Sequence, residues 1–237
     1  MPAPFQFKQF TVQQNRSAMK IGTDGVLLGA WVLLENSPES ILDIGTGTGV
    51  IALQLAQRST AETIDAVEID DEAYEEATEN FENSPWSDRL FCYHASIQEF
   101  ASEIDESYDF IVSNPPFYTE SVKTENPSRD RARFEEALPF QHLLVCAAHL
   151  LSEKGIFATI IPKKELQNFL ALAEQSQLFP KRICEVKGTP TAEAKRVLLE
   201  FSKYQQPSQI ETLTIELQRH QYTEEYTDLV KEFYLKM

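Results

Sequence analysis

The segment Asp43-Ile44-Gly45-Thr46-Gly47-Thr48-Gly49 is a glycine-rich turn between an apolar run at residues 40–44 and a helix-like segment at residues 50–57. Glycine adopts positive φ angles and lets the backbone approach a ligand closely. A strand, a glycine turn and a helix form the first unit of many nucleotide-binding α/β folds. The G-x-G-x-G spacing differs from the G-x-G-x-x-G of dinucleotide sites. The segment therefore predicts a nucleoside site, although alone it leaves a purely structural tight turn as the alternative.

Strand-like and helix-like segments alternate after this turn. The expected strands lie at residues 63–69, 90–94, 109–113, 155–161, 182–187 and 196–202, and the expected helices at 71–83, 139–151 and 166–176. Short apolar strands separated by helices indicate a mostly parallel sheet with helices on both faces. The last two strands are joined only by residues 188–194, and so short a connection requires an antiparallel pair. We therefore expect an α/β fold with one antiparallel strand.

The two ends of the chain read as additions to this core. Residues 5–12 alternate like a short strand, and an apolar helix begins near Val26, with Thr23 or Asp24 as its N-cap. Residues 210–217 predict a further strand and residues 223–235 a closing helix. We expect one domain over residues 1–237, with a catalytic core at 39–203, an extension at 1–38 and a C-terminal strand and helix at 204–237.

Composition restricts the function classes. The 237 residues are 42% hydrophobic, and 21 basic against 37 acidic residues give a net charge of −16. This charge argues against broad nucleic-acid affinity but allows a local basic patch. The three cysteines and four histidines are scattered, so we expect no disulfide framework and no metal. No secretion signal or bilayer-length apolar run is visible, which predicts a cytoplasmic protein without a membrane partner.

An acidic residue ends the second strand of the core. Glu68 lies where a carboxylate can accept hydrogen bonds from both ribose hydroxyls of a nucleoside. Asp70 and Asp71 follow directly, and their positions favour an N-cap and a first-turn acid of the next helix.

The second motif is Asn114-Pro115-Pro116-Phe117, which follows the strand at residues 109–113. Proline has no N–H group, so the sheet ladder must stop there. The Asn114 side-chain oxygen and a neighbouring backbone carbonyl can accept both hydrogens of a planar amine, and Phe117 can stack on the amine's ring or amide. The motif therefore predicts a site that holds a planar amine, and its structural alternative is a rigid turn with a packed Phe.

Together these motifs resemble the class I S-adenosylmethionine-dependent methyltransferases that carry Asp, Asn or Ser before Pro-Pro and an aromatic residue. That superfamily has a seven-stranded, Rossmann-like sheet with one antiparallel strand. Three further stretches resemble a narrower family, the bacterial tRNA adenine-N6 methyltransferases acting beside the anticodon of a valine tRNA. They are Phe7–Phe10 leading to Met19-Lys20-Ile21-Gly22-Thr23-Asp24-Gly25-Val26-Leu27-Leu28-Gly29-Ala30-Trp31, then Arg131-Ala132-Arg133-Phe134 before Leu138-Pro139-Phe140, and Phe233-Tyr234-Leu235-Lys236.

The resemblance implies S-adenosylmethionine as cofactor and assigns residues to it by position. Gly45, Gly47 and Gly49 would cradle the cofactor, Asp43 would anchor the loop, and Glu68 would hold the ribose. The turn from Lys20 through Thr23 to Asp24 would close over the methionine moiety. Ser96 and Ile97 stand where relatives often carry an acid that meets the cofactor adenine, and Asn114 would lie against both cofactor and substrate.

The implied reaction is a direct displacement that needs no metal and no nucleophilic side chain. Asn114, Pro115, Pro116 and Phe117 would position the amine, and Tyr118 could add a second stacking surface for a splayed base. Residues 120–133 would form a substrate loop on an enzyme that we expect to be a monomer. The expected phosphate contacts are Lys123, Arg129, Arg131, Arg133, Lys163 and Lys164, with Lys181, Arg182, Lys187, Lys195 and Arg196 around the late strands.

Two other substrates fit the same amine clamp. An rRNA guanine presents its N2 amine in the same geometry, and a protein glutamine offers a planar amide. The relatives acting on guanine are often longer, and those acting on glutamine usually have a separate N-terminal domain, for which this chain has no room. A binding module without activity is disfavoured, because both a cofactor motif and an amine motif are present.

Overall fold

The computed structural model describes residues 3–35, 37–116 and 138–237, and within them a mixed sheet of eight strands forms the centre. Its strands lie in the order β10-β8-β9-β7-β6-β3-β4-β5. Their bounds are β3 Ser40–Ile44, β4 Thr63–Glu68, β5 Leu90–His94, β6 Tyr108–Ser113, β7 Leu151–Pro162, β8 Phe179–Lys187, β9 Ala194–Ser202 and β10 Gln209–Thr214. In this sheet β9 alone runs antiparallel, between β7 and β8. The predicted strand pattern with one antiparallel strand is confirmed.

The sheet has one strand more than the predicted seven. β10 pairs in parallel with β8, from Gln209 opposite Arg182 to Thr214 opposite Lys187. Leu213 is the only buried residue of β10, so this edge strand lacks the apolar run that marks the others. The chain then turns into a small hairpin of β11 Glu216–Gln218 and β12 Gln221–Tyr222, so the predicted strand at residues 210–217 is two separate elements.

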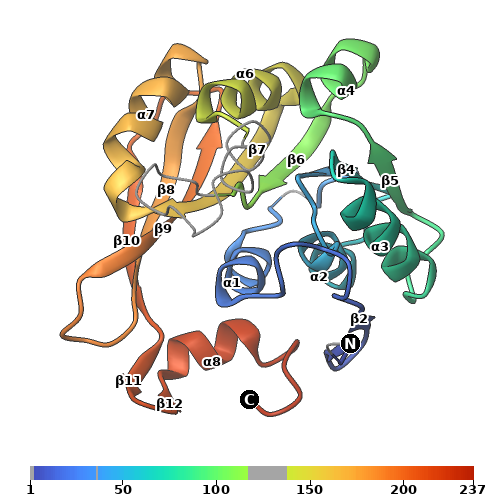
Figure 1. The fold of residues 1–237 in the computed structure, drawn as a ribbon. Helices are drawn as coiled ribbons and strands as arrows, with labels where there is room; N and C mark the ends of the chain where they lie inside the picture. The colour runs from blue at the N-terminus through green and yellow to red at the C-terminus, as the bar shows by residue number, and fades with distance from the viewer. Residues whose placement is uncertain (1–2, 36, 117–137) are drawn as a thin grey trace, which may run out of the picture.

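Helices cover both faces of the sheet (Figure 1). One face packs against α1 Thr23–Trp31, α2 Val50–Arg58, α3 Asp71–Glu82 and α8 Glu224–Val230, and the other against α4 Ile97–Glu103, α6 Phe140–Leu150 and α7 Leu166–Gln175. Successive residues of β3 point to opposite faces, so Ile41 belongs to the first core and Leu42 to the second. The two apolar layers fix the sheet between the helices and leave its carboxyl edge free for a site. No helix in the described residues is long and apolar enough to cross a membrane.

The two chain ends meet beneath the first face. β1 Phe5–Gln6 and β2 Thr11–Val12 form an antiparallel hairpin closed by a hydrogen bond from the Phe7 amide to the Phe10 carbonyl oxygen. The single strand predicted over residues 5–12 is therefore wrong. Phe7 also bridges to Tyr234, and their rings lie 6.0 Å apart, which joins the N-terminal hairpin to the C-terminal segment.

The start of α1 also differs from the prediction. Gly22 is the N-cap and makes no side-chain capping bond, so Thr23 and Asp24 lie in the first turn of the helix instead. An acid in the first turn interacts favourably with the helix dipole. The Asp24 carboxylate in addition pairs with Arg196 of β9 at 2.7 Å, which ties α1 to the antiparallel strand.

Candidate cofactor and substrate site

A cavity of about 650 Å³ opens at the carboxyl ends of β3, β4 and β6. This edge is where open α/β sheets bind ligands. The predicted residues that line the cavity are Gly45, Gly47, Glu68, Ser96, Ile97, Asn114, Pro115 and Pro116. The glycine turn, the acid after β4 and the described part of the Asn-Pro-Pro motif are thus brought together around one space.

The glycines of the turn have two different roles. Gly45, Gly47 and Gly49 all have positive φ angles, of 70°, 57° and 79°. A Cβ added at Gly45 or Gly47 would meet no atom within 4 Å, whereas one at Gly49 would lie 2.5 Å from a ring carbon of Phe81. The first two glycines therefore open onto the cavity. Gly49 does not line it, and instead is the N-cap of α2 and allows Phe81 of α3 to pack closely.

Asp43 holds the glycine turn in place through hydrogen bonds to its buried side chain. Its side chain is fully buried, and Oδ2 accepts hydrogen bonds from the Thr46 hydroxyl at 2.7 Å and the Ala52 amide at 3.2 Å. Its Oδ1 has no partner among the described residues. Burial raises the pKa of Asp43 to about 7. Asp43 anchors the loop as the resemblance implies, although it does not line the cavity.

Glu68 fastens the end of β4 to the glycine turn. Its Oε2 accepts a hydrogen bond from the Gly47 amide at 2.8 Å, and its Oε1 accepts from the Ile69 and Asp70 amides at 2.9 and 3.0 Å. An ionised carboxylate has about four acceptor positions, so these three bonds leave capacity for a ribose hydroxyl. Asp70 caps α3 by accepting from the Ala73 amide, as its position predicted.

Asn114 lies in the cavity wall directly after β6. The Ser113 hydroxyl donates to the Ile44 carbonyl oxygen at 2.8 Å, which holds the ends of β6 and β3 together. The Asn114 Oδ1 atom is buried and has no hydrogen-bond partner in the described part of the chain. A buried acceptor without a partner is energetically unfavourable, so this oxygen is suited to a donor from a ligand. Phe117 and Tyr118 lie outside the described residues.

At the N-terminus of α4, the cavity contains a carboxylate in addition to the serine hydroxyl expected there from the sequence. Ser96 lines the cavity, but its hydroxyl and amide both donate to Glu99 Oε2, at 2.7 and 3.0 Å, in a capping box. Hydrogen bonds from Ser96 lower the pKa of Glu99. Gln98 and Glu99 also line the cavity. Glu99, one helical turn after Ser96, is therefore an acid that lines the cavity at the N-terminus of α4.

The residues predicted to close over the methionine moiety lie next to the cavity wall and not in it. Lys20, Thr23 and Asp24 do not line the cavity, and the Lys20 ammonium instead donates to the carbonyl oxygens of Gln14 and Ser17. The cavity wall at this point consists of Ser17, Ala18 and Met19. Sequence reasoning missed these residues because they lie in an irregular segment without a glycine or periodic apolar signal.

The cavity residues that the α6 region contributes were also not predicted from the sequence. Leu138, Pro139 and His142 of the α6 region line it beside α4, and the His142 ring contacts the Gln98 amide of α4 at 3.1 Å. The expected basic residues Lys123, Arg129, Arg131 and Arg133, within the 120–133 loop, lie outside the described residues. No group of His, Cys, Asp or Glu able to hold a metal ion occurs in the part of the chain that the structure describes.

Lys163 and Lys164 follow β7 in a short 3-10 helix and do not line the cavity. Lys163 pairs with Glu185, and Lys164 lies 4.0 Å from Glu165. The two lysines nevertheless project from the sheet edge at which the cavity opens, because β7 is parallel to β6.

These features fit S-adenosylmethionine. Gly45 and Gly47 leave open space beside the backbone, and Glu68 offers acceptor capacity for a ribose. The buried Asn114 oxygen in the same cavity can accept a donor from a substrate. The family model described as "Methyltransferase small domain" matches residues 22–172. Fold and site together define a class I S-adenosylmethionine-dependent methyltransferase.

Solved structures and curated relatives agree with that class. A predicted O-methyltransferase from Agrobacterium tumefaciens superposes with a TM-score of 0.69 over 89% of this chain and 96% of its own, at 20% identity. At this identity it shows the fold alone. Proteins named tRNA1(Val) (adenine(37)-N6)-methyltransferase are 60% identical in Flavobacterium psychrophilum, over 98% of this chain and all of the relative, and 49% identical in Trichodesmium erythraeum, over 98% of each. The chain belongs to this family of tRNA methyltransferases.

Proposed function

We propose that this enzyme transfers the methyl group of S-adenosylmethionine to the N6 amine of adenine 37 in tRNA1(Val). The observation that carries the reaction type is the buried, unpartnered Asn114 oxygen in the same cavity wall as the glycine turn and Glu68. The choice of substrate follows the names of relatives that are up to 60% identical over almost the whole chain.

The proposed mechanism rests on orientation. When bound, S-adenosylmethionine supplies an electrophilic methyl group on a sulfonium. Glu68 and the open glycines Gly45 and Gly47 would hold its nucleoside. The Asn114 side-chain oxygen and the Pro115 carbonyl would accept the two N6 hydrogens, which withdraws the nitrogen lone pair from the ring and directs it at the methyl group. The methyl carbon would leave the sulfonium sulfur as it bonds to N6, S-adenosylhomocysteine would be the leaving group, and the methylated N6 ammonium would lose one proton to water, so no basic side chain is required.

Aromatic stacking and phosphate contacts would complete the substrate site. Phe117 and Tyr118 are proposed to stack on the splayed adenine, which offsets part of the lost base stacking. The 120–133 loop, with Arg129, Arg131 and Arg133, is proposed to contact tRNA phosphates.

A basic rim at the cavity edge supports RNA binding by an acidic protein. Lys163 and Lys164 follow the end of β7, Lys187 ends β8, and Arg196 lies opposite Pro162 and Val186 at the start of β9. Parallel strands end at one edge of the sheet, so these cations lie along the edge at which the cavity opens, with Lys163 paired to Glu185 and Arg196 to Asp24. By contrast, α3 carries acids such as Glu72, Glu75, Glu79 and Glu82. We propose that segregation of charge gives a local RNA surface despite the net charge of −16. A tRNA substrate also implies a cytoplasmic enzyme, and we propose that it acts as a monomer.

The test offers the protein with labelled S-adenosylmethionine to tRNA, rRNA and cellular protein in separate reactions. Digestion of each product identifies the methylated unit. The proposal predicts N6-methyladenosine in the tRNA reaction. Label found only as N2-methylguanosine in rRNA, or only as methylglutamine in protein, would refute the substrate and support one of the two alternatives that share the amine clamp.

A further inference from the structure

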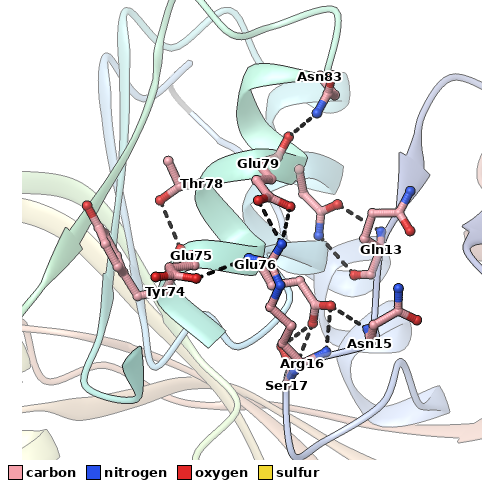
Figure 2. Close-up of polar contacts among 11 residues, drawn as sticks. Gln13, Asn15, Arg16, Ser17, Tyr74, Glu75, Glu76, Thr78, Glu79 and Asn83 are labelled. Carbon is pink, nitrogen blue, oxygen red and sulfur yellow. Dashed lines mark hydrogen bonds and ion pairs between the residues drawn. The ribbon is translucent and has the colours of Figure 1, made fainter. Parts of the chain in front are cut away.

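The segment at residues 13–19, here called the strap, forms one wall of the cofactor cavity and lies along α3. Ser17, Ala18 and Met19 line the cavity, whereas the preceding strap residues contact α3 through polar groups (Figure 2). The strap contains no helix or strand, so its backbone amides must find partners elsewhere. Their partners decide how firmly this wall is held.

One buried carboxylate accepts hydrogen bonds from three of these amides. Glu76 Oε1 accepts hydrogen bonds from the Asn15 amide and, at 2.8 Å, from the Arg16 amide. Its Oε2 accepts from the Ser17 amide at 2.9 Å and from the Ser17 hydroxyl at 2.6 Å. Three consecutive backbone amides thus converge on one side chain, in the manner of an anion-binding nest.

The hydrogen bonds that the strap donates to Glu76 depend on the negative charge of its carboxylate. The residue is only 1% exposed, and burial by itself opposes ionisation. Hydrogen bonds from the Ser17 hydroxyl and the three amides outweigh burial and lower the pKa of Glu76. Four donors fill the capacity of an ionised carboxylate. A glutamine of the same size would present N–H groups to backbone N–H groups, so it could not replace Glu76.

A second buried side chain joins the strap to the glycine turn. Asn80 is one turn along α3 from Glu76 and only 2% exposed. Its Oδ1 accepts from the Gln13 amide at 2.8 Å, and its Nδ2 donates to the carbonyl oxygens of Gln13 at 3.0 Å and Thr48 at 2.9 Å. Thr48 belongs to the glycine turn, whose Gly45 and Gly47 line the cavity. Asn80 therefore ties the strap to the glycine turn, and each of these two segments contributes residues to the cavity wall.

We propose that Glu76 and Asn80 are positioning residues for S-adenosylmethionine, which hold the strap against α3 in the conformation that completes the cofactor cavity. Neither side chain lines the cavity itself, so both act through the strap and the glycine turn. If the strap adopts its binding-competent conformation in only a fraction of the molecules, the apparent dissociation constant for the cofactor rises in inverse proportion to that fraction. The proposal deepens the proposed function at its cofactor site, but it concerns cofactor binding alone.

The chain offers a matched control on the same helix. The Arg16 side chain pairs with Glu79 at 2.7 Å and with Glu75 at 3.3 Å. Arg16 and Glu79 are 37% and 48% exposed, and exposed ion pairs of this kind contribute little. Glu79→Gln therefore removes the same charge from α3 as Glu76→Gln, but leaves the strap amides paired.

The experiment titrates S-adenosylhomocysteine into each variant by calorimetry, without RNA, and measures amide hydrogen exchange of the ligand-free proteins. Glu76→Gln should raise the dissociation constant about tenfold or more and accelerate exchange at residues 15–17, whereas Glu79→Gln should change neither. In turnover assays the KM for the methyl donor should rise while kcat changes little. Glu76→Asp, which keeps the charge, should lie between the wild type and Glu76→Gln.

Two further variants separate positioning from general instability. Phe201 lies in the core on the sheet face that does not pack against α3, so Phe201→Leu should lower the melting temperature without changing the dissociation constant. If Glu76→Gln does not fold, Asn80→Ser is measured in its place, with the same expected rise. An unchanged dissociation constant in the folded variant, or an equal rise in a Phe201→Leu protein of the same melting temperature, would overturn the proposal. Because no RNA is present, either outcome leaves the substrate assignment untouched.

Discussion

The backbone amide of Gly47 donates a 2.8 Å hydrogen bond to Oε2 of Glu68, so the glycine turn and the acid after β4 are held as one unit. The carboxylate thus shapes the loop in addition to facing the cavity. This dual contact is why Glu68 is expected to be sensitive even to a substitution of equal size.

Glu68→Gln should raise the dissociation constant for S-adenosylhomocysteine by about 10- to 100-fold, because hydrogen bonds to a charged group contribute about 1.5–3 kcal/mol. Calorimetric titration measures this change. Asp71→Asn is the control, since Asp71 follows in the same acidic run but its side chain is 87% exposed. An equal rise of the dissociation constant in both variants would mean that the local negative charge, and not the hydrogen bonds of Glu68, determines the affinity.

Asn114→Ala should lower kcat by at least ~100-fold, the scale found when one preorganised polar group is removed from an active site. The dissociation constant for S-adenosylhomocysteine should stay within about twofold, because the Asn114 oxygen is assigned to the amine of the substrate. Asn114→Asp keeps an acceptor oxygen and should retain more activity than the alanine variant. Comparable losses of cofactor affinity and turnover would make Asn114 a structural residue instead.

The stability of the ligand-free protein should fall as pH rises from about 4 towards 7 through Asp43. Burial raises the pKa of Asp43 from 3.8 to about 7, so between these values the folded state holds a proton that the unfolded state has released. Stability decreases with pH wherever the folded state binds more protons. Asp43→Asn should flatten this part of the profile, as measured by urea denaturation at pH 5 and pH 8. A profile with the same slope in both proteins would contradict the assignment.

Lys164→Ala should weaken tRNA binding and reduce the slope of log K against log salt by about one. Lys164 lies at the cavity edge of the sheet with 58% of its side chain exposed. Lys154→Ala is the matched control, because Lys154 lies near the opposite end of the same strand, β7. Filter binding over a series of salt concentrations gives both slopes. Equal effects of the two variants would remove the basic rim from the RNA surface.

The fold was largely predictable, because each core strand is a short apolar run with a helix or a tight connection after it. The antiparallel β9 followed from the short loop before it. β10 was harder to define, because an edge strand with one buried residue carries little apolar pattern.

The candidate site was predictable where a motif dictates backbone geometry or an acid follows a strand, as at Gly45, Gly47 and Glu68. The sequence does not show that the Lys20 ammonium turns back onto the Gln14 and Ser17 carbonyl oxygens, which leaves Lys20 outside the cavity wall. Glu76 gave no signal, because in the sequence it is one acid among many on α3. Its burial against the strap depends on a contact across 59 positions of the chain.

The most direct test of the account uses an unmodified tRNA1(Val) transcript, the purified enzyme and S-adenosylmethionine, followed by mass spectrometry of nuclease fragments. The account predicts one methyl group on N6 of adenine 37, its loss when adenine 37 is replaced by guanine, and its loss with the Asn114→Ala enzyme. A methyl group at another position, or a transcript left unmodified by an enzyme that binds S-adenosylmethionine, would contradict it.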